Sequence, residues 1–293
     1  MDGVVPAAEA PTDTTEPFAL FRPPRQTVPI VFTSPHSGRD YPAEFLAAAR
    51  LDPLGLRRSE DSFVDELFSA APAHGAPLLA ATFPRAFCDP NREAWELDPG
   101  MFEDPLPDWV NIASQRVGAG LGTIARVVAS GEPIYRGKLR FAEAERRVHR
   151  YWQRFHAELA SLIASTRAQF GCCLLIDCHS MPSGSAEGRG RVEFVLGDAH
   201  GTTCTPPMTR LAERLIAERG HAVRRNDPYA GGFITRHYGR PRDRVQALQI
   251  EIARHLYMDE VRIEKLPGFE AMQAEIAAII AGLARRVPAL LGG

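Results

Sequence analysis

The chain has 293 residues, of which 45% are hydrophobic and 24% are charged, and this length and composition are enough to bury one large core. Its 34 Lys and Arg nearly balance its 36 Asp and Glu, and the formal net charge of -2 favours neither a nucleic-acid-binding nor a membrane-surface protein. Five cysteines without CxxC spacing, and apolar runs far shorter than the ~20 residues of a membrane span, lead us to expect a reduced, cytoplasmic protein.

Along the chain, short apolar runs alternate with longer segments of helical spacing. Residues 1–20 are acidic and rich in Pro and Thr, which predicts a flexible tail rather than a signal peptide. No repeat or linker divides the remainder, so residues 21–293 are expected to form a single domain. The expected strands are residues 28–33, 77–83, 172–177, 192–196 and 245–252, and the expected helices are residues 143–168, 206–219 and 269–291.

This alternation is typical of an α/β protein. We expect a three-layer sandwich, with helices on both faces of a mixed, mainly parallel central sheet. Sheets of this kind bind their ligands at the carboxyl ends of the strands. Polar residues that directly follow an apolar run are therefore the candidates for function.

Two of the apolar runs end in a histidine. His36 stands in the Pro- and Gly-bounded turn Ser-Pro-His-Ser-Gly after the first run, and His179 stands in Asp-Cys-His-Ser after the third. Side chains alternate along a strand, so Asp177 and His179 share one face, and a buried Asp beside a His commonly orients the ring behind a metal. Each motif alone is weak, and His36 is equally compatible with a loop histidine that has no role.

Carboxylates supply two further candidates. Glu251 interrupts the apolar run Ala-Leu-Gln-Ile-Glu-Ile-Ala, where burial would raise its pKa toward the range of a general base; the alternative is a structural ion pair. Glu60, Asp61 and Asp65 precede a helical pattern and are explained by helix capping. Asp61 is nonetheless a candidate oxygen ligand that would complete a zinc site with two imidazoles.

Two motifs predict anion binding. One is Asp-Pro-Asn91-Arg92, and the other is the segment 224–239, which contains Arg225, the pair Gly231-Gly232 and Arg236. The planar fork of Arg grips carboxylates in a bidentate manner, and paired Gly residues let the backbone approach a small ligand closely. A lone Arg is more often a solvated surface residue, so the prediction depends on the grouping of these residues.

Taken together, the motifs SPHSGRDYP, DSFVDEL, DPNR, DCHS, NDPYAGGFITRHYG and QALQIEIARHLYMDE resemble the N-formylglutamate amidohydrolase family in order and spacing over residues 28–262. The stretches GGFITRHYG and LQIE are the specific part of this resemblance. It implies hydrolysis of N-formyl-L-glutamate to formate and L-glutamate, a step of histidine degradation. It also implies a fold similar to that of the zinc carboxypeptidases and aspartoacylases.

The resemblance also assigns roles to residues. It implies one catalytic zinc ion per chain, held by His36, His179 and a third residue. Carboxypeptidases take that third ligand from a Glu three positions after the first His, but Arg39 stands there, so Asp61 is expected ahead of Glu60 and Asp65. Glu251 falls at the place of the general base, with Arg92 assisting catalysis. The expected substrate-binding residues are Asn91, Arg92, Arg225, Arg236 and Gly232.

Two other functions are compatible with the sequence. One is a related zinc deacylase or carboxypeptidase-like hydrolase that acts on another N-acyl amino acid or a short peptide. The other is an anion-binding protein that retains the fold without catalysis. In each case the expected partner is a small molecule, preferably a dicarboxylate, with no nucleic acid or membrane, and the oligomeric state stays open.

Overall fold

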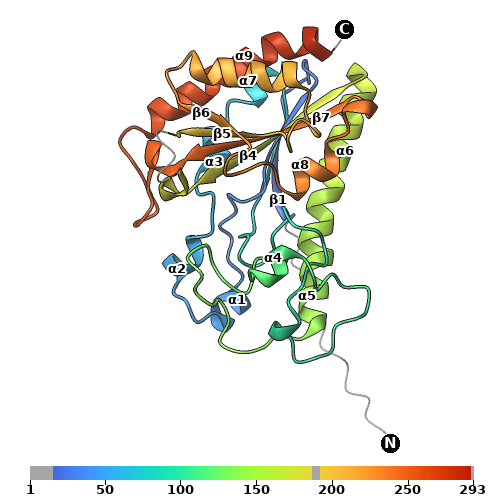
Figure 1. Ribbon diagram of the computed structural model, residues 1–293, viewed down its shortest axis with the longest axis vertical. Coiled ribbons are helices and arrows are strands. Elements are labelled where there is room, and N and C mark those ends of the chain that lie inside the picture. Colours follow the sequence, from blue (N-terminus) through green and yellow to red (C-terminus); the bar gives the residue numbers. More distant parts are fainter. Residues whose placement is uncertain (1–15, 187–191, 292–293) are drawn as a thin grey trace, which may run out of the picture.

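The computed structural model describes residues 16–186 and 192–291, and within them seven strands form one sheet (Figure 1). The strand order is β1-β3-β2-β4-β7-β5-β6. Four neighbouring pairs are parallel, whereas β1 with β3 and β5 with β7 are antiparallel. The strands of this sheet are β1 (Phe18–Phe21), β2 (Ile30–Ser34), β3 (Leu78–Ala81), β4 (Cys173–Met181), β5 (Phe194–Gly197), β6 (Val223–Arg225) and β7 (Val245–Ala253); β8 (Met258–Asp259) and β9 (Glu264–Lys265) form a separate pair.

All five predicted strands are present, and the apolar character of the central ones has a direct cause. Every residue of β4 and β7 is buried, because these neighbouring strands lie between helical layers. The two outer strands, β1 and β6, were not predicted. Because β1 begins at Phe18, residues 18–20 belong to the sheet, which corrects the predicted boundary of the tail; residues 1–15 lie outside the described residues.

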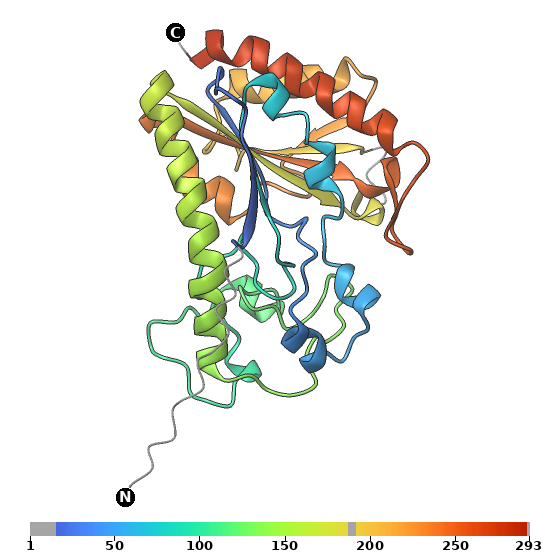
Figure 2. The same ribbon diagram turned by 180° about the vertical axis from the view of Figure 1, so that it is seen from behind.

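Helices cover both faces of the sheet. Phe32 and Ile176 pack in one core with α3 (Val64–Leu67), α7 (Pro206–Ala217) and α9 (Phe269–Leu291). Val31 and Leu175, which point the other way, pack in a second core with α6 (Gln153–Phe170) and α8 (Phe233–Tyr238). Figure 2 shows the long helices α6 and α9 on opposite sides of the sheet. The mixed, mainly parallel sheet and the helical layers on both of its faces are therefore confirmed.

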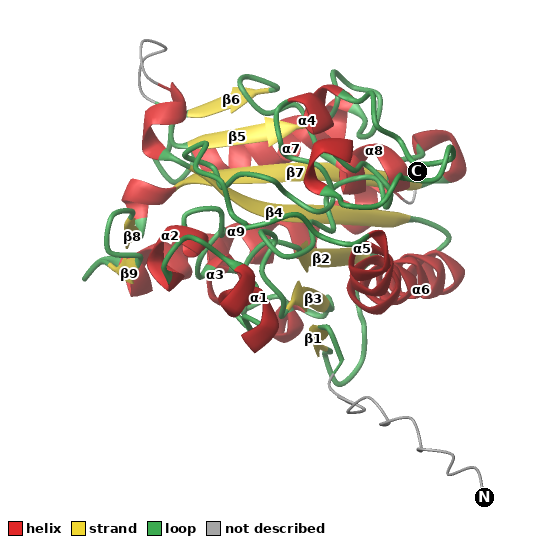
Figure 3. Ribbon diagram, turned by 90° about the horizontal axis from the view of Figure 1, so that it is seen from below, coloured by secondary structure: helices red, strands yellow, loops and turns green. Residues whose placement is uncertain are grey.

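A less regular region lies at the end of the sheet where β2 and β3 lead out (Figures 1 and 3). Its helices are short: α1 (Ala43–Ala48), α2 (Pro53–Arg57), α4 (Gln115–Gly118) and α5 (Phe141–Arg147), the last joined to α6 by a π-helical turn, η3 (Val148–Trp152). This region covers the carboxyl ends of the parallel strands, where the sequence places its candidate residues. None of the helices in the described ranges is long and apolar enough to cross a membrane.

Candidate metal centre and active-site cleft

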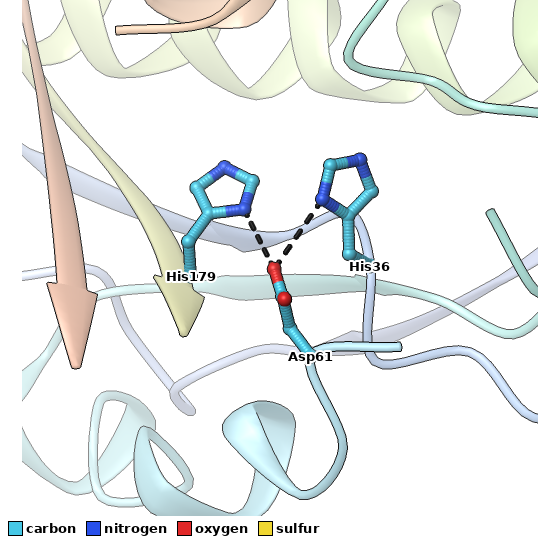
Figure 4. A group of neighbouring side chains, drawn as sticks. All are labelled: His36, Asp61 and His179. Atoms are coloured by element: carbon cyan, nitrogen blue, oxygen red, sulfur yellow. Dashed lines mark hydrogen bonds and ion pairs between the residues drawn. The ribbon is translucent and has the colours of Figure 1, made fainter. Parts of the chain in front are cut away.

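Three of the predicted side chains meet at the carboxyl ends of β2 and β4 (Figure 4). His36 lies in the turn after β2, His179 lies near the end of β4, and Asp61 lies in the loop between α2 and α3. The backbone N–H of Asp61 donates to the carbonyl of His36 at 3.0 Å, which ties the loop to the turn. Each of the three residues is at most 3% exposed, so the group is part of the interior.

The arrangement of this group fits a metal ion. Nδ1 of His179 and Nδ1 of His36 lie 2.9 Å and 3.3 Å from the same oxygen of Asp61, Oδ2 (Figure 4). A tetrahedral zinc ion with bonds of 2.0–2.2 Å holds its ligand atoms about 3.3 Å apart, close to these separations. His36 Nδ1 is buried and makes no hydrogen bond to any described residue, so a bound cation would satisfy it. The donor set of two imidazoles and one carboxylate is compatible with such an ion.

A second carboxylate lies against each histidine ring. His36 Nε2 lies 2.7 Å from Asp89 Oδ1, and His179 Nε2 lies 3.0 Å from Asp177 Oδ1. A carboxylate on one ring nitrogen sets the tautomer and leaves the other nitrogen for a metal, as is usual for metal-binding histidines. Asp177 was predicted in this position. Asp89 was not, because its motif was interpreted only as an anion pocket.

Of the three acidic residues considered as the third ligand, only Asp61 is brought to the histidines. The carboxylate of Glu60 accepts hydrogen bonds from Tyr41, Arg57 and Ser62 instead. Asp65 lies 3.9 Å from Arg39. Helix capping does not explain Asp61, because α3 is capped at Phe63 without any side-chain hydrogen bond.

The pKa values of Asp61 and His179 are strongly shifted from their ordinary values. Burial alone would raise the pKa of Asp61, but the hydrogen bond from His179 and the nearby charge of the His36 ring hold that pKa well below its ordinary value. His179 shows the converse effect: although burial opposes it, the Asp177 and Asp61 carboxylates raise its pKa well above the ordinary value. The carboxylates thus stabilise positive charge here, and this favours a cation as much as a proton.

Glu251 lies beside the group, opposite His179 in the β4–β7 pairing. It is 6% exposed and forms no ion pair with any residue in the described ranges, which leaves the structural alternative without support. Burial raises the pKa of Glu251 to about 7, with Asp61 and Asp177 adding to the shift and His179 and Arg85 opposing it. A carboxylate with this pKa can accept a proton near neutral pH.

Glu251 and the group of His36, Asp61 and His179 line one cleft, which has a volume of about 540 Å³. Five arginines and three carboxylates line it, so the protein side chains leave a positive surplus before any metal is counted. The segment 99–140 forms part of the cleft wall, through Arg116 and Leu121 among others. A hydrogen bond from the Asp89 N–H to the Thr123 carbonyl, at 2.7 Å, anchors the backbone of this segment. The lining arginines are Arg85, Arg92, Arg116, Arg236 and Arg254, and the lining carboxylates are Asp61, Asp89 and Glu251.

The predicted substrate-binding pair Asn91-Arg92 lines the cleft but is held by protein contacts. Asn91 Oδ1 accepts from the Ile234 N–H at 2.8 Å, and its Nδ2 lies 3.1 Å from His179 Nε2. Arg92 donates from Nε to the Leu121 carbonyl and from Nη1 to its neighbour's carbonyl, at 2.9 and 2.8 Å. Only Nη2 of Arg92, 3.7 Å from Asp89, is left without a close acceptor among the described residues.

Of the other predicted substrate-binding residues, two line the cleft and one does not. Gly232, the N-cap of α8, and Arg236, in the last turn of the same helix, line the cleft. Arg225 does not: it lies on the outer strand β6 and pairs with Glu213 of α7, which corrects the prediction that it reaches the site. Arg85, which sequence analysis missed, donates to Asp89 Oδ2 at 2.7 Å and lines the cleft instead.

The fold and cleft thus define an α/β protein in which the candidate metal-binding group, His36, Asp61 and His179, lies beside a carboxylate of raised pKa. The profile of the N-formylglutamate amidohydrolase family matches residues 28–258. An N-formylglutamate deformylase from Pseudomonas aeruginosa is 31% identical over 242 residues, which cover 80% of this chain and 84% of that protein. One from Pseudomonas putida is 28% identical over 238 residues, with 80% and 83% covered. The chain therefore belongs to the N-formylglutamate amidohydrolase family, as its motifs suggested.

Solved structures agree with this assignment. The crystal structure of N-formylglutamate amidohydrolase from Ralstonia eutropha JMP134 is similar to this chain, with a TM-score of 0.88 and 40% sequence identity. The match covers 93% of this chain and 99% of that one. A gene product from Agrobacterium tumefaciens, 18% identical with a TM-score of 0.60 over 95% of this chain and 94% of its own, shares the fold.

Proposed function

We propose that this protein is a zinc-dependent amidohydrolase that cleaves N-formyl-L-glutamate to formate and L-glutamate. Its relatives from Pseudomonas and Ralstonia are named for that activity. The observation that carries the proposal here is that the metal-binding group, Glu251 and several arginines open on one cleft. A histidine and carboxylate group at the carboxyl ends of a mixed sheet also supports the proposed relation to the zinc carboxypeptidases.

His36, Asp61 and His179 would hold the zinc ion, because two imidazoles and one carboxylate are a usual donor set of catalytic zinc. When bound, zinc supplies Lewis acidity that polarises the formyl carbonyl and lowers the pKa of water. Asp89 and Asp177 would keep both rings aimed at the ion.

Glu251 would move the proton. As a carboxylate it takes a proton from the attacking water, whose oxygen forms a bond to the formyl carbon. The C–N bond then breaks, and the protonated Glu251 gives its proton to the departing α-amino nitrogen. Gln249 donates to Glu251 Oε1 at 2.8 Å, which leaves Oε2 for this transfer.

Positive charge near the reacting carbonyl would come from Arg85 and Arg92. Both contact Asp89, at 2.7 and 3.7 Å, and this carboxylate also holds His36. Burial, with Arg85 and Arg116 nearby, lowers the pKa of Arg92 to about 10 against the opposing effect of Asp89. Crowded guanidinium groups of this kind favour an anion in the cleft, including the negative oxygen that develops during hydrolysis.

Recognition of the carboxylates of glutamate would involve the two cleft arginines without an acidic partner. Arg116 on α4 and Arg236 on α8 line the cleft and pair with no carboxylate in the described part of the chain. An arginine fork binds a carboxylate through two parallel hydrogen bonds. A substrate with two carboxylates would therefore be preferred over one with a neutral side chain.

A substrate panel tests this proposal. We expect N-formyl-L-glutamine, which lacks the side-chain charge, to have a kcat/KM at least about tenfold below that of N-formyl-L-glutamate, since a charged hydrogen bond contributes ~1.5–3 kcal/mol. Arg236→Ala should reduce this preference. The matched control Arg225→Ala should not, because Arg225 lies outside the cleft.

Two outcomes would contradict the proposal. Faster hydrolysis of N-acetyl-L-glutamate than of the formyl compound would move the substrate to another N-acyl amino acid. Binding of glutamate without hydrolysis of any member of the panel would favour a non-catalytic anion-binding protein.

A further inference from the structure

Arg254 lies directly behind the candidate metal ligand Asp61. It begins η6 (Arg254–Leu256) just after β7, three residues beyond Glu251, and it is only 8% exposed. Its Nη2 donates to Asp61 Oδ1 at 3.2 Å and to the Glu60 carbonyl at 2.7 Å, and its Nε donates to Ser180 Oγ at 3.2 Å. A buried arginine with this many partners is fixed in one position.

The two oxygens of Asp61 consequently have different environments. Oδ1 accepts from Arg254 and also from Ser180 Oγ, at 3.3 Å. Oδ2 faces the Nδ1 atoms of both histidines. A carboxylate binds a metal through one oxygen or both, and two donors on Oδ1 hold the group so that Oδ2 alone is presented.

Arg254 also joins the segments that carry the ligands. Its contacts reach the loop of Asp61 through the Glu60 carbonyl, and β4 through Ser180, the residue after His179. One guanidinium group at the end of β7 thus links the loop that carries Asp61 to the strand that carries His179.

We propose that Arg254 is a positioning residue for the metal: it fixes Asp61 as a one-oxygen ligand through the planar fork of its guanidinium. This inference rests on the proposed function, because it takes the ion to bind at His36, Asp61 and His179. It differs from a role in substrate binding, since Nε and Nη2 of Arg254 are already donated to protein oxygens.

The test measures zinc affinity directly. Purified protein is stripped of metal, and its zinc dissociation constant is measured by competition with a chromophoric chelator. Loss of a partner of a metal ligand typically weakens binding 10- to 100-fold, and we expect this range for Arg254→Met. Arg254→Lys should also bind zinc more weakly than the unsubstituted protein, because one ammonium group cannot reproduce the fork.

Two further variants keep the test decisive. Ser180→Ala removes the other donor to Asp61 Oδ1 and should weaken zinc binding by a smaller factor than Arg254→Met does. This variant tests the hold on Asp61 Oδ1 independently if an Arg254 variant does not fold. Arg286→Met, an exposed arginine of α9, is the control and should leave the dissociation constant unchanged. At saturating zinc, Arg254→Met should recover most of its kcat with little change in KM for N-formyl-L-glutamate.

Three results would overturn the inference. These are an unchanged zinc dissociation constant in Arg254→Met, full affinity in Arg254→Lys, or a raised KM with unaltered zinc binding, which would make Arg254 a substrate contact. Failure of the unsubstituted protein to bind zinc would overturn the proposed function together with the inference. Weakened zinc binding in the variants of a protein that hydrolyses no formyl amino acid would support Arg254 while rejecting the substrate.

Discussion

Glu251 is the residue whose surroundings most directly suit the proposed chemistry. It is buried on β7 opposite His179, with one oxygen held by Gln249. Burial raises its pKa to about 7, and the carboxylates of Asp61 and Asp177 add to that shift. In water a glutamate of ordinary pKa is a weak base at neutral pH, whereas the buried group is matched to proton transfer there.

Replacement of this carboxylate tests its role. Glu251→Gln keeps the shape of the side chain but cannot accept a proton, so kcat should fall by about 10²–10⁴-fold. Zinc content should stay that of the unsubstituted protein, because Glu251 is not in the metal-binding group. Steady-state kinetics and metal analysis of the same preparation measure both, and near-normal turnover would exclude Glu251 as the base.

The same residue predicts the pH dependence. As pH falls through the pKa of Glu251, the carboxylate gains a proton and activity should decline. A bound cation would lower this pKa, so the acid limb of kcat/KM is expected between the ordinary value of 4.5 and about 7. This limb should be absent from the residual activity of Glu251→Gln, and its persistence there would assign it to another group.

Some residues of the candidate site could be predicted from the sequence and others could not. His36, His179 and Glu251 could be predicted because each interrupts or ends an apolar run. Asp89 and Arg254 could not, since their partners His36 and Asp61 lie 53 and 193 positions away in the sequence. Only the folded chain brings such pairs together.

At the scale of elements, the segment leading into α8 connects the cleft to the histidines. The Gly232 N–H donates to Gln249 Oε1 at 2.8 Å, and the Ile234 N–H donates to Asn91 Oδ1. Asn91 in turn lies against His179. The glycine pair predicted to approach a ligand is thus also packed against residues that contact the candidate metal-binding group.

A methyl group at Gly232 should disturb this connection. A Cβ there would lie 2.4–2.6 Å from the amide atoms of Asn91, so this amide, which lies against His179, must shift. We expect Gly232→Ala to lower kcat/KM at least about tenfold and to destabilise the fold by ~1–3 kcal/mol, as overpacking does. Gly137→Ala, whose Cβ would meet no atom within 4 Å, is the matched control.

Thermal unfolding and kinetics of both variants measure the effect. Equal activity and melting temperature for Gly232→Ala and Gly137→Ala would show that the contact with Asn91 is not required.

The elements themselves were largely predictable, because β4 and β7 are continuous apolar runs. The strands β1 and β6 were missed: they are short outer strands, and β6, Val-Arg-Arg, has no apolar pattern.

On the scale of the whole molecule, the proposed function depends on segments distant in sequence meeting at one end of the sheet. The turn after β2, the loop before α3, β4, β7 and the segment 99–140 all contribute to the cleft. The sequence predicted the layered fold, and it predicted that His36, Asp61 and His179 lie together. It did not predict which arginines face the cleft, because Arg85 and Arg116 carry no local pattern that distinguishes them from surface residues such as Arg225.

The central claim is that a zinc ion at His36, Asp61 and His179 is required for hydrolysis of N-formyl-L-glutamate. The most direct measurement is zinc content together with formate release, before chelation, after chelation and after return of zinc. We predict close to one zinc ion per chain, loss of turnover on chelation and recovery with zinc. Full turnover by protein that holds well below one metal ion per chain would contradict the claim.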